Sequence, residues 1–194
     1  MEEGHEPLAR GRTRELLGQR RVQLVLLIAA AAAILGIAWL VVGNDTFTSS
    51  DEPTALPVGP VGLSASGMVT LGNAVGQPIY WAGPKQGYVY ELTRTEQGNV
   101  YIRYLPPRVD VGAKEAKYLV IVTYPYKDAF NALKNVANGK EVAIPGGGIA
   151  LVDESSPRSV HVAFPNTDYQ VEVYDPSPAR SLEVARSGAV RPAH

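Results

Sequence analysis

The chain has 194 residues, with 18 basic and 19 acidic side chains, and it contains no cysteine. The absence of cysteine excludes disulfides, thiol nucleophiles, cysteine-ligated zinc, iron–sulfur clusters and a lipidated cysteine anchor. The 13 basic residues of positions 43–194 are scattered along the sequence. Since a nucleic-acid site needs a basic stripe, we expect no nucleic-acid partner.

An Arg-rich segment, residues 1–21, precedes an apolar stretch at residues 22–42 (VQLVLLIAAAAAILGIAWLVV) that carries no charge. As a helix this stretch spans about 31 Å, which matches the hydrocarbon core of a bilayer. Arg20 and Arg21 directly precede it, and the next basic residue is Lys85. The positive-inside rule therefore predicts a cytoplasmic N-terminus, a single transmembrane helix in contact with membrane lipid, and an extracytoplasmic C-terminal part.

The alternatives to a retained anchor are a buried helix of a soluble protein, which the uninterrupted apolar run disfavours, and a cleaved signal peptide. Its apolar region would be shorter, about 7–15 residues, and would end in a small-x-small cleavage site. Residues 41–43 (VVG) are a poor site of this kind. We therefore favour an anchored protein at the cell membrane.

One face of the predicted transmembrane helix carries small residues, which are Ala29, Ala32, Ala33 and Gly36. Small residues at this spacing allow two membrane helices to approach closely, so this face is a candidate contact for a homodimer. The alternative is that alanine is simply common in this anchor.

Residues 43–66 are rich in Gly, Pro, Ser and Thr and are interpreted as a linker. Residues 67–194 are predicted to form the extracytoplasmic domain, with flexible last residues. Alternating or continuous apolar patterns predict strands at 78–82, 88–95, 100–105, 118–124, 141–145, 148–153, 160–164 and 169–174. Helical spacing predicts a helix at 127–138, and Ser177, Pro178 and Gly188 bracket a short second helix.

These elements predict an α+β fold class. We expect a mostly antiparallel β-sheet with one mid-chain helix and one short C-terminal helix, preceded by a single transmembrane helix. The Gly-rich run at 144–149 (IPGGGI) lacks the Lys-Ser/Thr pair of a P-loop, so it predicts a hairpin turn or bulge with positive φ.

No motif for catalysis, a cofactor or a metal is present, and we expect none of these. His161 is interpreted as a solvated or cross-strand residue on the polar face of a strand. Five acids on or beside strands are interpreted as solvated, and they are Glu91, Glu141, Asp153, Glu172 and Asp175. A glycan hydrolase would instead need two of these acids to face one pocket.

Aromatic residues are the unusual feature of the domain, which holds all ten tyrosines and Trp81. Core packing is the favoured interpretation, and recognition of a partner or a glycan is the alternative. The candidates for such a surface are Trp81, Tyr101, Arg103 and Tyr126.

Three stretches carry a resemblance: residues 80–95 (YWAGPKQGYVYELTRT), 100–106 (VYIRYLP) and 169–177 (YQVEVYDPS). With them the chain resembles a group of bacterial membrane-anchored proteins without a known activity. The resemblance implies the anchor-plus-domain layout and assigns no functional residue.

The first functional hypothesis is therefore a membrane-anchored binding or structural domain for an envelope protein or glycan ligand. A cell-envelope glycan hydrolase and a membrane-bound regulator acting through its cytoplasmic N-terminus are the alternatives.

Overall fold

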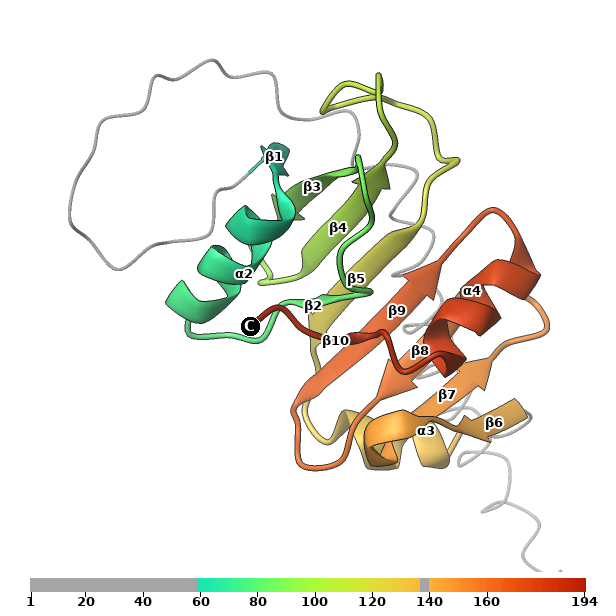
Figure 1. Cartoon of the computed structure of the whole chain (residues 1–194). Helices are drawn as coiled ribbons and strands as arrows, with labels where there is room; N and C mark the ends of the chain where they lie inside the picture. The colour runs from blue at the N-terminus through green and yellow to red at the C-terminus, as the bar shows by residue number, and fades with distance from the viewer. Residues whose placement is uncertain (1–58, 137–139) are drawn as a thin grey trace, which may run out of the picture.

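The computed structural model describes residues 59–136 and 140–194. This part of the chain is an α+β unit built on an eight-stranded antiparallel sheet (Figure 1). The sheet has the order β1-β3-β4-β5-β9-β8-β7-β6, and a separate two-stranded ribbon joins β2 to β10. The predicted α+β class with a mostly antiparallel sheet is confirmed.

Eight of the ten described strands overlap the ranges expected from the sequence, whereas β1 and β10 were not expected. They are β1 (Val61–Leu63), β2 (Tyr80–Trp81), β3 (Val89–Arg94), β4 (Val100–Leu105), β5 (Val120–Pro125), β6 (Lys140–Ala143), β7 (Ile149–Val152), β8 (Ser159–Ala163), β9 (Tyr169–Tyr174) and β10 (Arg191–Pro192). The turn between β3 and β4 contains Gly98 at φ +82°, a conformation that glycine adopts without steric cost. The Gly-rich run likewise forms a tight 3₁₀ turn, Pro145–Gly147, with positive φ at Gly146 and Gly147.

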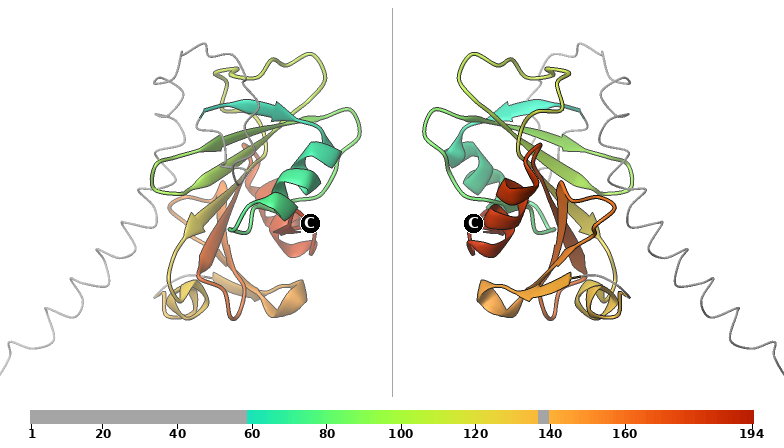
Figure 2. Two further views of the ribbon diagram at one scale, coloured as in Figure 1. Left: turned by 90° about the vertical axis from the view of Figure 1, so that its left-hand side faces the viewer. Right: turned by 90° about the vertical axis from the view of Figure 1, so that its right-hand side faces the viewer.

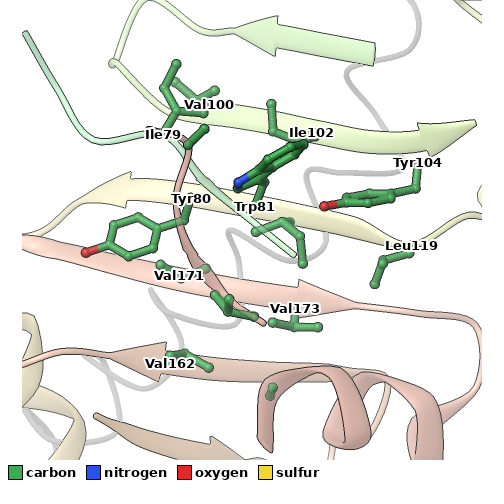
Figure 3. Close-up of a cluster of buried hydrophobic side chains, with 14 of the residues drawn as sticks. Ile79, Tyr80, Trp81, Val100, Ile102, Tyr104, Leu119, Val162, Val171 and Val173 are labelled. Atoms are coloured by element: carbon green, nitrogen blue, oxygen red, sulfur yellow. The ribbon is translucent and has the colours of Figure 1, made fainter. Parts of the chain in front are cut away.

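One face of the large sheet, here called the first face, carries the main core. It is covered by the β2–β10 ribbon and by helices α2 (Ala65–Ala74) and α4 (Pro178–Arg186) (Figure 2). Side chains of β2 lie directly over apolar side chains of four central strands (Figure 3). The alternate residues Val100 and Ile102 of β4 and Val171 and Val173 of β9 point into this core and are fully buried.

The opposite face of the sheet, here called the second face, is packed more locally. At one end helix α3 (Ala129–Lys134) places Ala129 and Leu133 against apolar residues of β7 and β8. Nearer the middle Tyr101, Val120, Val122 and Tyr124 form a smaller cluster. Strand β5 is therefore buried on both faces, as its continuous apolar run predicts.

The first helix of the domain was not expected from the sequence. Residues 61–66, assigned to the linker, form β1 and the start of α2, and the helix continues to Ala74, where no element was predicted. Ser64 caps this helix by accepting a hydrogen bond from the Gly67 N–H at 3.1 Å. Met68 is fully buried against the first face, so tertiary packing outweighs the low helix propensity of Gly67 and Gly72.

The two expected helices are both present. The mid-chain helix is shorter than the predicted 127–138: it begins only at Ala129, after Asp128 at φ +55°, and it ends at Lys134. Helix α4 begins after Ser177 with Pro178 in its first turn, and Gly188, at φ +76°, follows its end. The sequence therefore located α4 more accurately than α3.

The predicted transmembrane segment and its small-residue face (Ala29, Ala32, Ala33, Gly36) lie outside the described residues. Within 59–136 and 140–194, no helix has both the length and the apolar character needed to cross a bilayer.

Candidate functional site: a buried carboxylate cluster

Glu172 lies at the centre of the second face and is completely buried. Its Oε2 accepts a hydrogen bond from the Tyr124 hydroxyl at 2.7 Å, and its Oε1 accepts one from the Ser159 hydroxyl at 2.6 Å. Burying a carboxyl group is costly unless it is hydrogen bonded, and both oxygens here have a donor.

The register of three adjacent strands brings these side chains together. Glu172 on β9 lies opposite Val122 on β5, so Tyr124 is its diagonal neighbour on the same face. On the other side Glu172 lies opposite His161 of β8, and Ser159 is the diagonal neighbour there. The cluster is thus a direct product of strand pairing and of the two-residue period of side chains.

His161 forms a second, adjacent part of the cluster. Only 3 % of His161 is exposed, and its Nδ1 lies 2.8 Å from Nε2 of Gln170, one strand away. Burial lowers the pKa of His161, an effect that the nearby Glu172 and Asp153 carboxylates oppose. The neutral imidazole is therefore the form that this site favours. The cross-strand interpretation of His161 is confirmed, and the solvated one is wrong.

Two tyrosines extend the cluster toward β4. Tyr101 and Tyr124 meet edge to face with ring centroids 6.4 Å apart. Burial, followed by the negative charge of Glu172, raises the pKa of Tyr124 well above its usual range. Burial also raises the pKa of Tyr101, while its hydrogen bond to Tyr124 acts in the opposite direction. Both phenols therefore remain protonated and available as donors.

The arrangement differs from that of a serine hydrolase, although it contains a serine, a histidine and an acid. In such enzymes the histidine lies between the serine and the acid and accepts the serine proton. Here Ser159 donates directly to Glu172, and His161 bonds Gln170 instead. Ser159 is thus the donor to a buried acceptor, which is the geometry of a structural hydrogen-bond network.

Glu91 is the second buried acid of the second face. It pairs with Arg103, whose Nη2 donates to Oε2 at 3.0 Å and whose Nε forms a charge contact with Oε1 at 2.7 Å. The Gly112 N–H also donates to this carboxylate, which ties the loop 106–117 to the sheet. Both carboxylate oxygens of Glu91 thus contact protein groups.

The separation of Glu91 and Glu172 does not fit a glycoside hydrolase pair. They lie on β3 and β9, three strand spacings apart in the sheet, or about 14 Å. Glycosidase carboxylates are about 5–9.5 Å apart. Glu91 and Asp175 are buried as well, so the expectation that these acids and Glu172 are solvated is wrong. Glu141 is exposed, as expected.

In the described part of the chain no three His, Asp or Glu side chains are grouped so as to hold a metal ion. The cluster thus offers hydrogen-bonding groups and one carboxylate.

The candidates for a ligand or partner surface occupy different places. Trp81 is only 4 % exposed and packs in the first-face core, in edge contact with the Tyr90 ring. Tyr101 is buried in the second-face cluster. Arg103 is mostly covered by its pairing with Glu91, and Tyr126 is half-buried beside α3. For Trp81 and Tyr101 the core interpretation of the aromatic residues is confirmed.

The Glu172 cluster itself was missed by the sequence analysis, although the sequence contains a signal for it. Strands β8 (SVHVA) and β9 (YQVEVY) both carry polar residues at every second position. When two neighbouring strands carry polar side chains on the same face, these side chains can hydrogen bond to one another. The four side chains concerned are Ser159, His161, Gln170 and Glu172.

Comparisons with known proteins add no relative: no protein-family model, no curated protein and no solved structure matches this chain.

Proposed function

We propose that this chain is a single-pass membrane protein that displays a non-enzymatic binding or structural domain outside the cell membrane. The observation that carries the proposal is the uncharged stretch 22–42 between Arg20–Arg21 and the folded unit that begins at Val61. The resemblance to bacterial membrane-anchored proteins supports the same layout.

A binding or structural role, rather than hydrolysis, is supported by the state of the polar groups. The buried acids Glu172 and Glu91 are bonded to Ser159, Tyr124 and Arg103, and no water-accessible pair of acids is formed between them. The alternative of an envelope glycan hydrolase would require one of these acids to break its hydrogen bonds to the protein and contact the substrate. The alternative of a regulator depends on residues 1–21, which lie outside the described part.

Membrane topology is tested with the full-length chain in intact cells and in inside-out vesicles. Protease added outside intact cells should remove the domain and leave the N-terminus protected, and carbonate washing should leave the protein in the membrane fraction. Replacing Arg20 and Arg21 by Glu should weaken the orientation preference. Recovery of the full-length protein in the soluble fraction would contradict the proposal.

The binding role is tested by crosslinking the full-length protein in its own membrane. Because the chain has no cysteine, a single Tyr126→Cys variant provides a unique attachment point beside α3. A Gln97→Cys variant at the exposed β3–β4 turn is the matched control. A product specific to one position supports a defined partner surface, whereas equal labelling of both positions contradicts it.

A further inference from the structure

We propose that one corner of the domain, formed by Val89, Val111 and the loop 106–117, rests on the outer surface of the anionic membrane. The inference depends on the proposed membrane anchor. It goes beyond the anchor by specifying which side of the domain faces the lipid.

The corner combines exposed apolar side chains with a loop that carries a small basic excess. Of the large apolar side chains in the described residues, Val89 at 39 % and Val111 at 41 % are the exposed ones. The loop 106–117 that carries Val111 holds three basic and two acidic residues, and Lys85 lies in the neighbouring loop before β3. The Lys85 ammonium is 4.1 Å from the centre of the half-buried Tyr88 ring. Exposed apolar side chains in or next to a segment with a basic excess are typical of surfaces that bind anionic lipid.

The two valines lie beside the point where the predicted linker enters the fold. A Cβ atom added to Gly62 of β1 would lie 2.7 Å from Val111 Cγ2 and 3.2 Å from Val89 Cγ1. Gly62 therefore lies directly against both side chains, three residues after the first described residue. Figure 1 shows β1 and the loop after β4 at the same end of the domain.

The length of the chain before this corner limits how far it can move from the bilayer. Residues 43–58 separate the predicted transmembrane helix from Gly59. A flexible coil of this length has ends about 22 Å apart. A domain of this size is about 35 Å across, so a tether of this average span favours orientations in which the corner at the attachment point is nearest the lipid. A tether this short gives an effective concentration in the millimolar range, so a weak surface affinity suffices.

Site-specific fluorescence in the full-length protein tests this orientation. Ala113→Cys places a single label in the loop beside Val111, and Gln97→Cys places one at the opposite end of the β3–β4 hairpin. The protein is incorporated into nanodiscs of phosphatidylglycerol and phosphatidylcholine that contain a spin-labelled lipid as quencher. We expect quenching at position 113 to be at least threefold greater than at position 97.

Two loop variants test the chemistry of the contact. Val111→Asp should reduce quenching at position 113 to the level of position 97, whereas Val111→Ile should leave it unchanged. Discs of phosphatidylcholine alone should also reduce it, and unchanged quenching there would contradict the preference for anionic lipid. Equal quenching at the two positions would overturn the proposal. Shielding of position 113 from aqueous iodide without lipid quenching would assign the corner to a protein partner and would overturn it too.

The same experiment separates this inference from the proposed anchor. Failure of the full-length chain to co-elute with the discs would contradict the anchor itself. Co-elution without preferential quenching at position 113 would contradict only the orientation of the domain.

Discussion

His161 and Glu172 lie directly opposite each other on β8 and β9, yet each is hydrogen bonded to a different set of partners. The imidazole pairs with Gln170, and the carboxylate accepts from Ser159 and Tyr124. An acid and an imidazole that share a proton are a common catalytic unit, but here both groups are satisfied separately and buried. The second face is therefore held together by polar contacts as well as by apolar ones.

Replacement of Glu172 should reveal how much the buried network stabilises the domain. Glu172→Ala removes the acceptor of two buried hydroxyl groups, so we expect a loss of about 3 kcal/mol in the free energy of unfolding. Glu172→Gln keeps the shape and one carbonyl acceptor and should cost about 1 kcal/mol. Urea unfolding of the full-length protein in detergent is followed by Trp81 fluorescence in a Trp39→Phe background. Equal losses for the two variants would contradict a hydrogen-bonding role.

Stability should fall as the pH decreases below neutrality because of His161. Its pKa is lowered in the folded protein, so the unfolded chain binds the additional proton first. The stabilisation is fully present above the unfolded pKa of about 6.5 and is lost as the pH falls below it, by at most about 1.4 kcal/mol per pH unit. A His161→Gln variant should show a flatter dependence of unfolding free energy between pH 5 and 7.5. An identical slope in both proteins would show that other groups cause it.

Gly72 is required where helix α2 meets the last residues of the sequence. A Cβ atom at this position would lie 1.6 Å from the Ala193 carbonyl oxygen, which belongs to the backbone and cannot move without displacing β10. Gly72→Ala should therefore cost about 2–3 kcal/mol of stability, although alanine has a higher helix propensity than glycine. Gly76→Ala is the matched control, since a Cβ there has no neighbour within 4 Å, and thermal unfolding should be almost unchanged.

Arg103 should not be replaceable by lysine. Its guanidinium contacts both oxygens of Glu91 and lies 5.9 Å from the Tyr118 ring centre, whereas a lysine ammonium is a point charge that cannot make the forked contact. We expect Arg103→Lys to cost about 1 kcal/mol of unfolding free energy and to increase proteolysis of the loop 106–117. Arg180→Lys, at a half-exposed ion pair with Asp175, serves as the control and should change stability little.

The sequence predicted the sheet well because apolar alternation along β3, β4, β8 and β9 reports one buried face directly. It predicted α2 poorly, since Gly67 and Gly72 weaken the local helical signal and packing of Met68 supplies the missing stability. The polar alternate positions were assigned to solvent because a strand pattern identifies only which residues share a face. Whether that second face is exposed to solvent depends on the neighbouring strands. Here the hydroxyl groups of Tyr124 and Ser159 donate to Glu172 and offset the desolvation cost of burying its carboxylate.

The packing of α2 against Ala193 has a consequence for how the protein is assembled. Ala193 donates its N–H to Ile79 and presents its carbonyl against Gly72, so the earliest and latest segments of the domain complete the same core. On the proposed topology the N-terminal anchor enters the bilayer first, and residue 193 crosses the membrane after the segments 65–190 that it packs with. Native packing of α2 then has to wait until residue 193 has crossed the membrane, which keeps this core open during the passage of the segments between them.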